Sequence, residues 1–272
     1  ITTRLVGSEM CIRDRNIAVT TVLKPDADSL RRARKKAEDL RTAFYEREKN
    51  LFHMSEKYGE EGFLVYGKKP VFFWSKEGTY RFHLGTAVLR IFEMRKGHGD
   101  RLCNLLPGDC TSVLDCTFGQ GRDSVILSWY LRKRGEVISL ERSRPLYEVG
   151  KEGLAALSGQ DGEMTEALRR IQLLHADFRG FLETAAPNSF DVIYFDPMFR
   201  YPVKRKENSI EGFRSAAVYD PLTEDVLQFA MRAARKKVIV KERPFSALFR
   251  TGLFTEIHGK RGQTTAYGVI KL

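Results

Sequence analysis

The alternation of apolar and polar positions changes character near residue 111. From there onwards, short apolar runs rich in Val, Ile and Leu alternate with longer amphipathic stretches. This alternation predicts an α/β fold, with a parallel sheet and helices on both of its faces. The expected strands are residues 111–115, 136–141, 170–175, 190–195 and 236–241, and the expected helices are residues 121–134, 144–157, 178–185 and 222–235.

Two further apolar segments close the chain, at residues 253–258 and 265–272, and polar residues 259–263 join them. They predict a hairpin that follows the five strand–helix units. A closing hairpin of this kind completes the Rossmann-like, seven-stranded sheet of class I methyltransferases. The pattern therefore predicts that variety of α/β fold.

The preceding part of the chain has a different pattern, which predicts a small N-terminal α+β unit of residues 16–80 ahead of a main domain of residues 81–272. Residues 1–15 are expected to be a non-native leader and are left out of the fold. The small unit is expected to contain a strand at 17–22, a helix that follows 26–29 and ends near 40, a helix at 51–58, and a hairpin of 63–66 with 71–74; a longer helix is expected at 86–106.

The composition adds a basic surplus. The formal net charge is +11 and the isoelectric point is about 9.5. This favours a polyanionic partner, because neutralised phosphates release counterions, although a generally basic soluble protein has the same composition. No apolar run approaches the roughly 20 residues of a membrane span, so we expect no transmembrane helix. The four cysteines show no CxxC pairing and, like the histidines, lack metal-ligand spacing, so we expect reduced thiols in a cytoplasmic protein and no metal.

A glycine loop follows the first strand of the main domain. Asp115 ends that strand, and Gly119 and Gly121 follow it. The two glycines allow a tight turn and close approach to a ligand, because neither carries a Cβ atom. A dinucleotide fingerprint needs a third glycine three residues after Gly121, and its absence weakens an NAD interpretation. The loop therefore predicts contact with a nucleotide-like cofactor, although a purely structural turn can use the same residues. Together with Glu141 and the closing hairpin, the missing third glycine narrows the cofactor to S-adenosylmethionine.

Two further acids lie at the ends of the next strands. Glu141 follows the loop by about twenty residues, where a carboxylate can accept hydrogen bonds from both ribose hydroxyls. A solvated acid paired with Arg142 or Arg144 is the alternative. Asp177 follows the third strand, where it can receive the adenine amino group, cap the next helix, or do both.

The segment that follows the fourth strand suits a flat substrate with an amino group. The carboxylate of Asp196 and the carbonyl of Pro197 are acceptors that can hold amine hydrogens and direct the nitrogen lone pair. Phe199 can stack on a base, at about 1–3 kcal/mol. We expect these three to be the catalytic residues; an Asp-Pro turn with a core phenylalanine is the alternative.

Basic residues lie immediately after this segment. We expect Lys204, Arg205 and Lys206 to bind RNA phosphates. A second basic group, residues 31–36, can be either an RNA-backbone surface or a solvated helix face. The aromatic residues of 72–80 are expected to be core.

Several of these segments together resemble one known family. The chain carries, in order, the motifs DCTFGQGRD (115–123), LER (140–142), LHA (174–176), YFDPMF (194–199) and VIVKERP (238–244). They are similar to the RsmJ family, which methylates the guanine N2 amine of 16S ribosomal RNA with S-adenosylmethionine. The resemblance covers residues 81–245. It implies that the cofactor is surrounded by Arg122, Asp123, Glu141, Arg142, Ala176, Asp177 and Asp196. The chain departs from the family at 177–178, where the family has two serines, and at Glu242.

We therefore expect an S-adenosylmethionine-dependent methyltransferase that acts on an exocyclic base amine of RNA. Guanine N2 of small-subunit ribosomal RNA is the leading substrate. A DNA amino methyltransferase is the second hypothesis, since it uses the same acid-proline-aromatic chemistry after base flipping. A non-catalytic RNA-binding or cofactor-sensing protein of the same fold is the third. The oligomeric state is left open.

Overall fold

The computed structural model describes residues 17–157, 162–197, 213, 216–217, 221–259 and 262–272. The chain divides into two compact units. The first contains the residues up to Arg81, with 143–149 and 207–216, and the second contains the remainder, which begins at Phe82. Helix α5 (Arg144–Ala156) contributes residues to both. No helix in the described ranges is long and apolar enough to cross a membrane.

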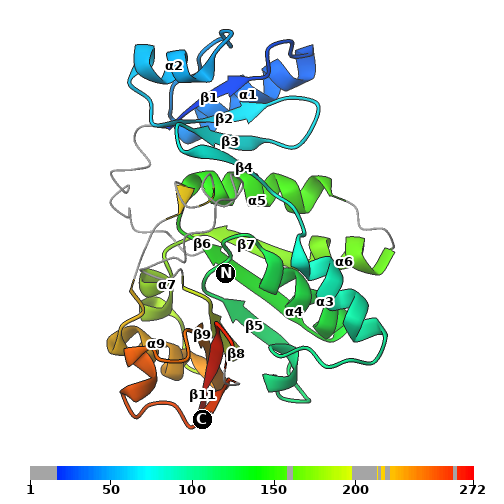
Figure 1. The fold of residues 1–272 in the computed structure, drawn as a ribbon, viewed down its shortest axis with the longest axis vertical. Coiled ribbons are helices and arrows are strands. Elements are labelled where there is room, and N and C mark those ends of the chain that lie inside the picture. The colour runs from blue at the N-terminus through cyan, green and yellow to red at the C-terminus, as the bar shows by residue number, and fades with distance from the viewer. Residues whose placement is uncertain (1–16, 158–161, 198–212, 214–215, 218–220, 260–261) are drawn as a thin grey trace. The chain divides into compact units, whose positions relative to one another are not determined.

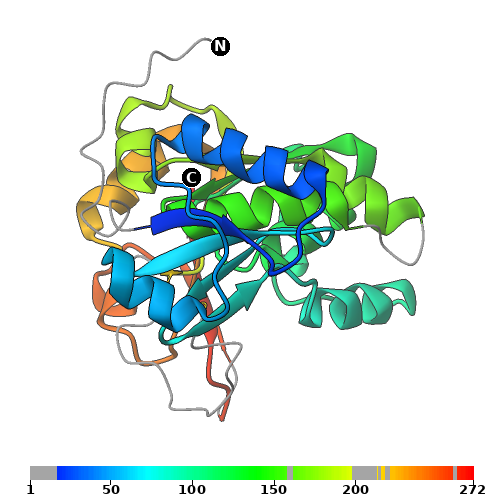
Figure 2. The same cartoon turned by 90° about the horizontal axis from the view of Figure 1, so that it is seen from above.

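The first unit is a four-stranded sheet with two helices. Its strands, in the order β1-β2-β3-β4, are Ile17–Thr21, Gly62–Tyr66, Phe72–Ser75 and Gly78–Arg81. Strand β1 runs parallel to β2, and the other neighbours are antiparallel. Figure 2 shows α1 (Ala27–Leu40) and α2 (Leu51–Tyr58) on either side of the strands. The expected α+β character is confirmed.

The second unit contains the predicted seven-stranded sheet, in the order β10-β11-β9-β8-β5-β6-β7. All pairs from β9 to β7 are parallel, and the two pairs formed by β11 are antiparallel. The strands are β5 (Ser112–Asp115), β6 (Glu136–Glu141), β7 (Ile171–His175), β8 (Phe190–Phe195), β9 (Ala234–Glu242), β10 (Glu256–His258) and β11 (Ala266–Lys271). The Rossmann-like fold is therefore confirmed.

Helices cover both faces of this sheet because successive residues of each strand point to opposite sides. Leu114 and Ile193 pack in the cluster that contains residues of α7 (Phe178–Thr184) and α9 (Glu224–Ala233). Val113 and Val192 pack in the opposite cluster, with Leu127 of α4 (Arg122–Leu131). Figure 1 shows α3 (Thr86–Arg95), α4 and α6 (Gly162–Arg170) on one side of the sheet, and α7 and α9 on the other.

The strand order creates a switch point next to β5. The chain builds β5, β6 and β7 in one direction and then returns to place β8 on the other side of β5. Ligands of open α/β sheets bind at the carboxyl ends of the strands that flank such a point. The fold thus directs attention to the ends of β5, β6 and β8.

Three predicted elements were wrong in extent or missed. The helix expected at 86–106 ends at Arg95, and the carboxylate of Asp100 then accepts the N–H groups of Leu102 and Cys103 at the start of a short 3-10 turn, η2 (Cys103–Leu105). Strand β4 was missed because it is short and mostly polar. Helix α6 was also missed, although its Met164, Ala167 and Leu168 are buried at helical spacing.

Candidate active site

The glycine loop and the Asp-Pro segment meet at the switch point. The backbone N–H of Cys116, just after β5, donates to the carbonyl of Tyr194 in β8 at 2.9 Å. The N–H of Asp196 donates to the hydroxyl of Thr117 at 2.6 Å. The two segments that the sequence singled out are therefore joined by hydrogen bonds.

Asp115 lies beneath the loop rather than on its surface. It is 1% exposed, and its carboxylate accepts the N–H of Thr117 at 3.0 Å and the hydroxyl of Ser124 at 2.5 Å. Burial raises the pKa of Asp115 to about 7, against the effect of these hydrogen bonds. The structure thus shows Asp115 as the residue that ties the loop to the start of α4.

The two glycines of the loop adopt conformations that other residues disfavour. Gly119 has φ +54° and Gly121 has φ +72°. A Cβ atom on Gly121 would lie 2.6 Å from the ring of Phe118 and 2.9 Å from that of Phe82. Helix α4 begins at the next residue, and no side chain caps it. The loop therefore brings uncapped backbone N–H groups, with their positive helix end, to the switch point.

Glu141 connects the loop to the end of β6. Its Oε2 atom accepts the N–H of Gly119 at 2.9 Å, and the residue is buried. It is therefore not the solvated surface acid of the alternative interpretation. This contact places a carboxylate directly beside the glycine backbone, at the position expected for the ribose of a nucleoside cofactor.

Arg142, Ala176 and Asp177 lie next to Glu141, at the ends of β6 and β7. The N–H of Ala176 donates to the carbonyl of Glu141 at 3.1 Å, and Arg142 lies 3.6 Å from the carboxylate of Asp177. Asp177 also caps α7, since its Oδ1 atom accepts the N–H of Gly180 at 2.9 Å. The predicted capping role is present, and the three residues share one edge with the glycine loop.

Arg122 provides a test of whether the site fits the cofactor. It is the first residue of α4, and its Nε atom is buried without a hydrogen-bond partner among the described residues. A buried donor at a helix start is an anion-binding feature. The carboxylate of the methionine part of S-adenosylmethionine would supply such an anion, and Glu141 would supply a carboxylate acceptor for its ribose. The residues present therefore fit this cofactor.

Asp123 is the centre of a buried charge network. It accepts hydrogen bonds from Arg90 of α3, from the Tyr194 hydroxyl at 2.8 Å and from Lys241 of β9 at 3.0 Å. Arg90 also forms a bidentate pair with Asp100, at 2.8 and 2.9 Å. Although burial opposes it, the charges of Lys241 and Arg90 hold the pKa of Asp123 well below its usual range.

Asp196 is the partly buried and most accessible member of this network. Its Oδ2 atom lies 2.6 Å from Nζ of Lys241, and its side chain is 31% exposed. Burial raises the pKa of Asp196 to about 6, with a contribution from Asp123, and outweighs the opposing effect of Lys241. Lys241, held between two carboxylates, has a pKa raised above its ordinary value despite its burial. The Asp196 carboxylate is thus anchored by a charged lysine.

Sequence reasoning assigned no role to Lys241 or Arg90. Lys241 lies at the end of a predicted strand beside β8, so the strand-end rule that selected Asp196 also selects it. Arg90 lies on a helix whose packing the sequence does not reveal. Of the predicted residues, Phe199 and the group Lys204, Arg205 and Lys206 lie outside the described residues, whereas Pro197 is described and buried.

Comparisons with known proteins agree with the fold. Residues 82–262 match the family described as "Putative SAM-dependent methyltransferase". A Bacillus subtilis (strain 168) protein, "Uncharacterized protein YpiP", is 30% identical over 257 residues, which cover 93% of this chain and 98% of that protein.

Two further relatives are named "Ribosomal RNA small subunit methyltransferase J". The Cellvibrio japonicus protein is 33% identical over 171 residues, 59% of this chain and 62% of the relative. The Brucella anthropi protein is 30% identical over 193 residues, 68% of this chain and 90% of the relative.

One solved structure has the same fold over nearly the whole chain. The SAM-dependent methyltransferase NGO1261 from Neisseria gonorrhoeae superposes with a TM-score of 0.60 at 15% identity, and the match covers 93% of this chain and 95% of that structure. The chain therefore belongs to the SAM-dependent methyltransferase family, and S-adenosylmethionine is its cofactor.

Proposed function

We propose that this enzyme methylates an exocyclic base amine of RNA, and that the base is guanine, at N2, in small-subunit ribosomal RNA. The observation that carries the proposal is the Asp196 carboxylate at the switch point, with one oxygen anchored by Lys241 and Pro197 next to it. The names of the two J-type relatives support the substrate class. An enzyme with this substrate acts in the cytoplasm.

The proposed role of Asp196 follows from the chemistry of the amine. An exocyclic amine is a weak nucleophile because its lone pair is delocalised into the ring. Acceptors for its two hydrogens favour a pyramidal nitrogen whose lone pair points to the methyl group. The free oxygen edge of Asp196 and the carbonyl of Pro197 are such acceptors. This is electrostatic and positional catalysis, with no covalent enzyme intermediate.

The proton balance also involves Asp196. S-adenosylmethionine supplies an electrophilic methyl group; the nitrogen forms the new C–N bond as the S–C bond breaks. The alkylated nitrogen then carries one proton too many. A carboxylate whose pKa is raised to about 6 can take that proton and pass it to water at neutral pH.

Lys241 is proposed as a positioning residue for this step. Its ammonium group bonds to Oδ2 of Asp196 at 2.6 Å and to Oδ2 of Asp123 at 3.0 Å. Since Asp123 is itself held by Arg90 and Tyr194, the lysine has little freedom to move. The network thus fixes the Asp196 carboxylate plane before substrate arrives.

An aromatic side chain is available for the base on the same edge of the sheet. Phe245 is 88% exposed and follows Lys241 by four residues, which limits their Cα separation to about 14 Å. Residues 243–246 form a turn closed by the Ser246 N–H and the Arg243 carbonyl at 3.0 Å, with Pro244 at its second position. We propose that Phe245 stacks on a substrate base, as the sequence also suggests for Phe199.

Methyl transfer with labelled cofactor tests the proposal. Purified enzyme is incubated with methyl-labelled S-adenosylmethionine and, in parallel, with ribosomal RNA, small ribosomal subunits or duplex DNA. We expect label in RNA or subunits and none in the DNA, and loss of transfer in Asp196→Ala. Transfer to DNA alone supports the second hypothesis, and cofactor binding with no transfer to any acceptor supports the third. Unchanged transfer in Asp196→Ala refutes the assigned role.

A further inference from the structure

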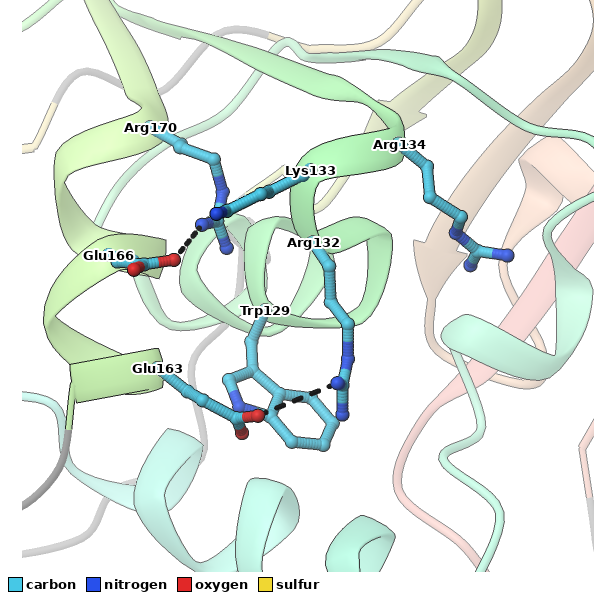
Figure 3. Close-up of a pocket in the computed structure, with 7 residues that line it drawn as sticks. All are labelled: Trp129, Arg132, Lys133, Arg134, Glu163, Glu166 and Arg170. Carbon is cyan, nitrogen blue, oxygen red and sulfur yellow. Dashed lines mark hydrogen bonds and ion pairs between the residues drawn. The ribbon is translucent and has the colours of Figure 1, made fainter.

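A basic pocket lies at the opposite end of α4 from the glycine loop. Its volume is about 320 Å³. It is formed by the end of α4, the 3-10 turn η3 (Arg132–Arg134) and α6, as Figure 3 shows. Helix α4 has 10 residues and is therefore about 15 Å long. Trp129 lies in the last turn of α4, so most of the helix separates the pocket from the cofactor loop.

Two buried donors in this pocket have no acceptor. The indole Nε1 of Trp129 and the Nε atom of Arg170 are buried and make no hydrogen bond to any described residue. Both side chains line the pocket, but the two nitrogen atoms themselves are closed off from solvent, and Trp129 as a whole is 6% exposed. Unsatisfied buried donors are unfavourable, so a ligand oxygen that displaces the neighbouring side chains would gain these hydrogen bonds.

The lining carries more positive than negative charge. The lining contains four basic residues, Arg132, Lys133, Arg134 and Arg170, and two acids, Glu163 and Glu166. Arg132 pairs with Glu163 at 3.5 Å and Arg170 with Glu166 at 3.2 Å, both at solvent-accessible positions where such pairs are weak. Lys133 is exposed and forms no ion pair within the described part of the chain. An incoming anion therefore meets cations that weak pairs do not neutralise.

The arrangement around Trp129 favours phosphate over a stacked base. The guanidinium groups of Arg95 and Arg132 lie 5.6 and 5.3 Å from the centre of its ring system. Figure 3 shows the Arg132–Glu163 pair across the indole. Cation–π contacts thus occupy the ring and orient the guanidinium groups, while the indole N–H remains a donor.

We propose that this pocket binds a backbone phosphate of the RNA substrate at a distance from the reacting base. The inference rests on the proposed RNA substrate and adds a second point of contact to it. Because about 12 Å of helix, from Gly121 to Trp129, separates the cofactor loop from the pocket, one nucleotide cannot occupy both. The pocket therefore makes the enzyme prefer a longer or folded RNA over a short fragment.

Charge reversal at Lys133 tests the inference. Binding of a ribosomal RNA fragment is measured for wild type, Lys133→Ala and Lys133→Glu across a salt series. We expect affinity to fall about 3–10-fold for Lys133→Ala and further for Lys133→Glu. The slope of log affinity against log salt should become shallower by about 0.7–0.9, because one phosphate is no longer neutralised. The KM for S-adenosylmethionine should not change. Lys271, exposed on strand β11, provides the matched controls Lys271→Ala and Lys271→Glu.

The results separate this inference from the proposed function. RNA affinity and salt slope equal to wild type in Lys133→Glu overturn the inference, even where methyl transfer to RNA occurs. The same holds if inorganic phosphate binds the pocket while RNA affinity is unaffected by the substitution. Conversely, the wild-type enzyme can fail to methylate any RNA while Lys133→Glu still weakens RNA binding. That result supports the phosphate site and refutes the proposed activity. Trp129→Phe, which keeps an aromatic but smaller ring and removes the N–H group, should also weaken RNA binding.

Discussion

The Nζ atom of Lys241 lies 2.6 Å from Oδ2 of Asp196, and this ion pair joins the ends of two neighbouring parallel strands. The lysine also bonds to Asp123, so a single cation holds two carboxylates of opposite pKa behaviour. Asp123 is the permanent counter-ion, and Asp196 is the carboxylate whose charge state can change.

Lys241→Met should reduce kcat by about 10²-fold and leave the KM for S-adenosylmethionine nearly unchanged, because it removes a preorganised donor behind Asp196. It should also cost up to about 3–5 kcal/mol of unfolding free energy, since the partly buried Asp196 loses its cation while the buried Asp123 keeps Arg90. Steady-state kinetics and chemical denaturation measure the two effects. Lys241→Arg keeps the charge and should recover part of kcat. Wild-type kcat in Lys241→Met contradicts the positioning role.

The rate of methyl transfer should rise with pH through about 6 and then level off. The rate rises with pH because Asp196 must be ionised to accept the amine hydrogens. With a pKa of about 6, it is protonated at lower pH and cannot do so. Below pH 6 the rate should fall about tenfold per pH unit. Lys241→Met should move this limb to higher pH, because the lysine charge favours the ionised acid. A profile that is flat from pH 5 to 7 in wild type, or an unchanged limb in Asp196→Asn, contradicts the assignment.

Gly121→Ala should weaken both the fold and cofactor binding. Its φ is +72°, and the new Cβ atom would lie 2.6 Å from the Phe118 ring. We expect a loss of about 1–3 kcal/mol of unfolding free energy and a lower affinity for S-adenosylmethionine, measured by denaturation and calorimetry. Gly108→Ala is the control: it meets nothing within 4 Å and should stay within about 0.5 kcal/mol. Equal unfolding free energies and equal affinities for S-adenosylmethionine in the two variants would show that the loop does not need Gly121.

Phe245→Ala should raise the KM for RNA about 5- to 100-fold, the range expected for the loss of one base stack. Phe245→Trp retains an aromatic face and should remain close to wild type. Ile257→Ala removes another exposed apolar side chain, 51% exposed on strand β10, and serves as the control. The KM for S-adenosylmethionine should be the same in all three. An unchanged KM for RNA in Phe245→Ala removes this residue from the substrate site.

The parallel strands could be predicted from sequence because each is a short, buried apolar run that ends in polar residues. The same pattern predicted that Asp196 and Glu141 lie at one edge of the sheet, because the carboxyl ends of parallel strands share that edge. Elements with a weak hydrophobic pattern were not predicted. Strand β4 has few apolar residues, and the turn around Gly97 ends a helix that the sequence pattern continues to residue 106.

Contacts between segments that are far apart in the chain could not be predicted from the sequence. Asp123 appeared as a cofactor contact through a family resemblance, but it is buried against Arg90, a residue 33 positions earlier. Only the packing of α3 against α4 brings these two charges together. Asp115 likewise appeared as a ligand residue, whereas its carboxylate is engaged by Thr117 and Ser124 inside the fold. Strand ends predict where chemistry gathers, but tertiary packing decides which groups face the ligand.

Nucleoside analysis of RNA labelled by the purified enzyme tests the central claim most directly. Small-subunit ribosomal RNA is methylated with labelled S-adenosylmethionine, digested to nucleosides and separated against standards, for wild type and Asp196→Asn. The account predicts that the label elutes as N2-methylguanosine and that Asp196→Asn gives almost none. Label in a ring-carbon, ribose or other base position, or equal labelling by the two enzymes, would contradict it.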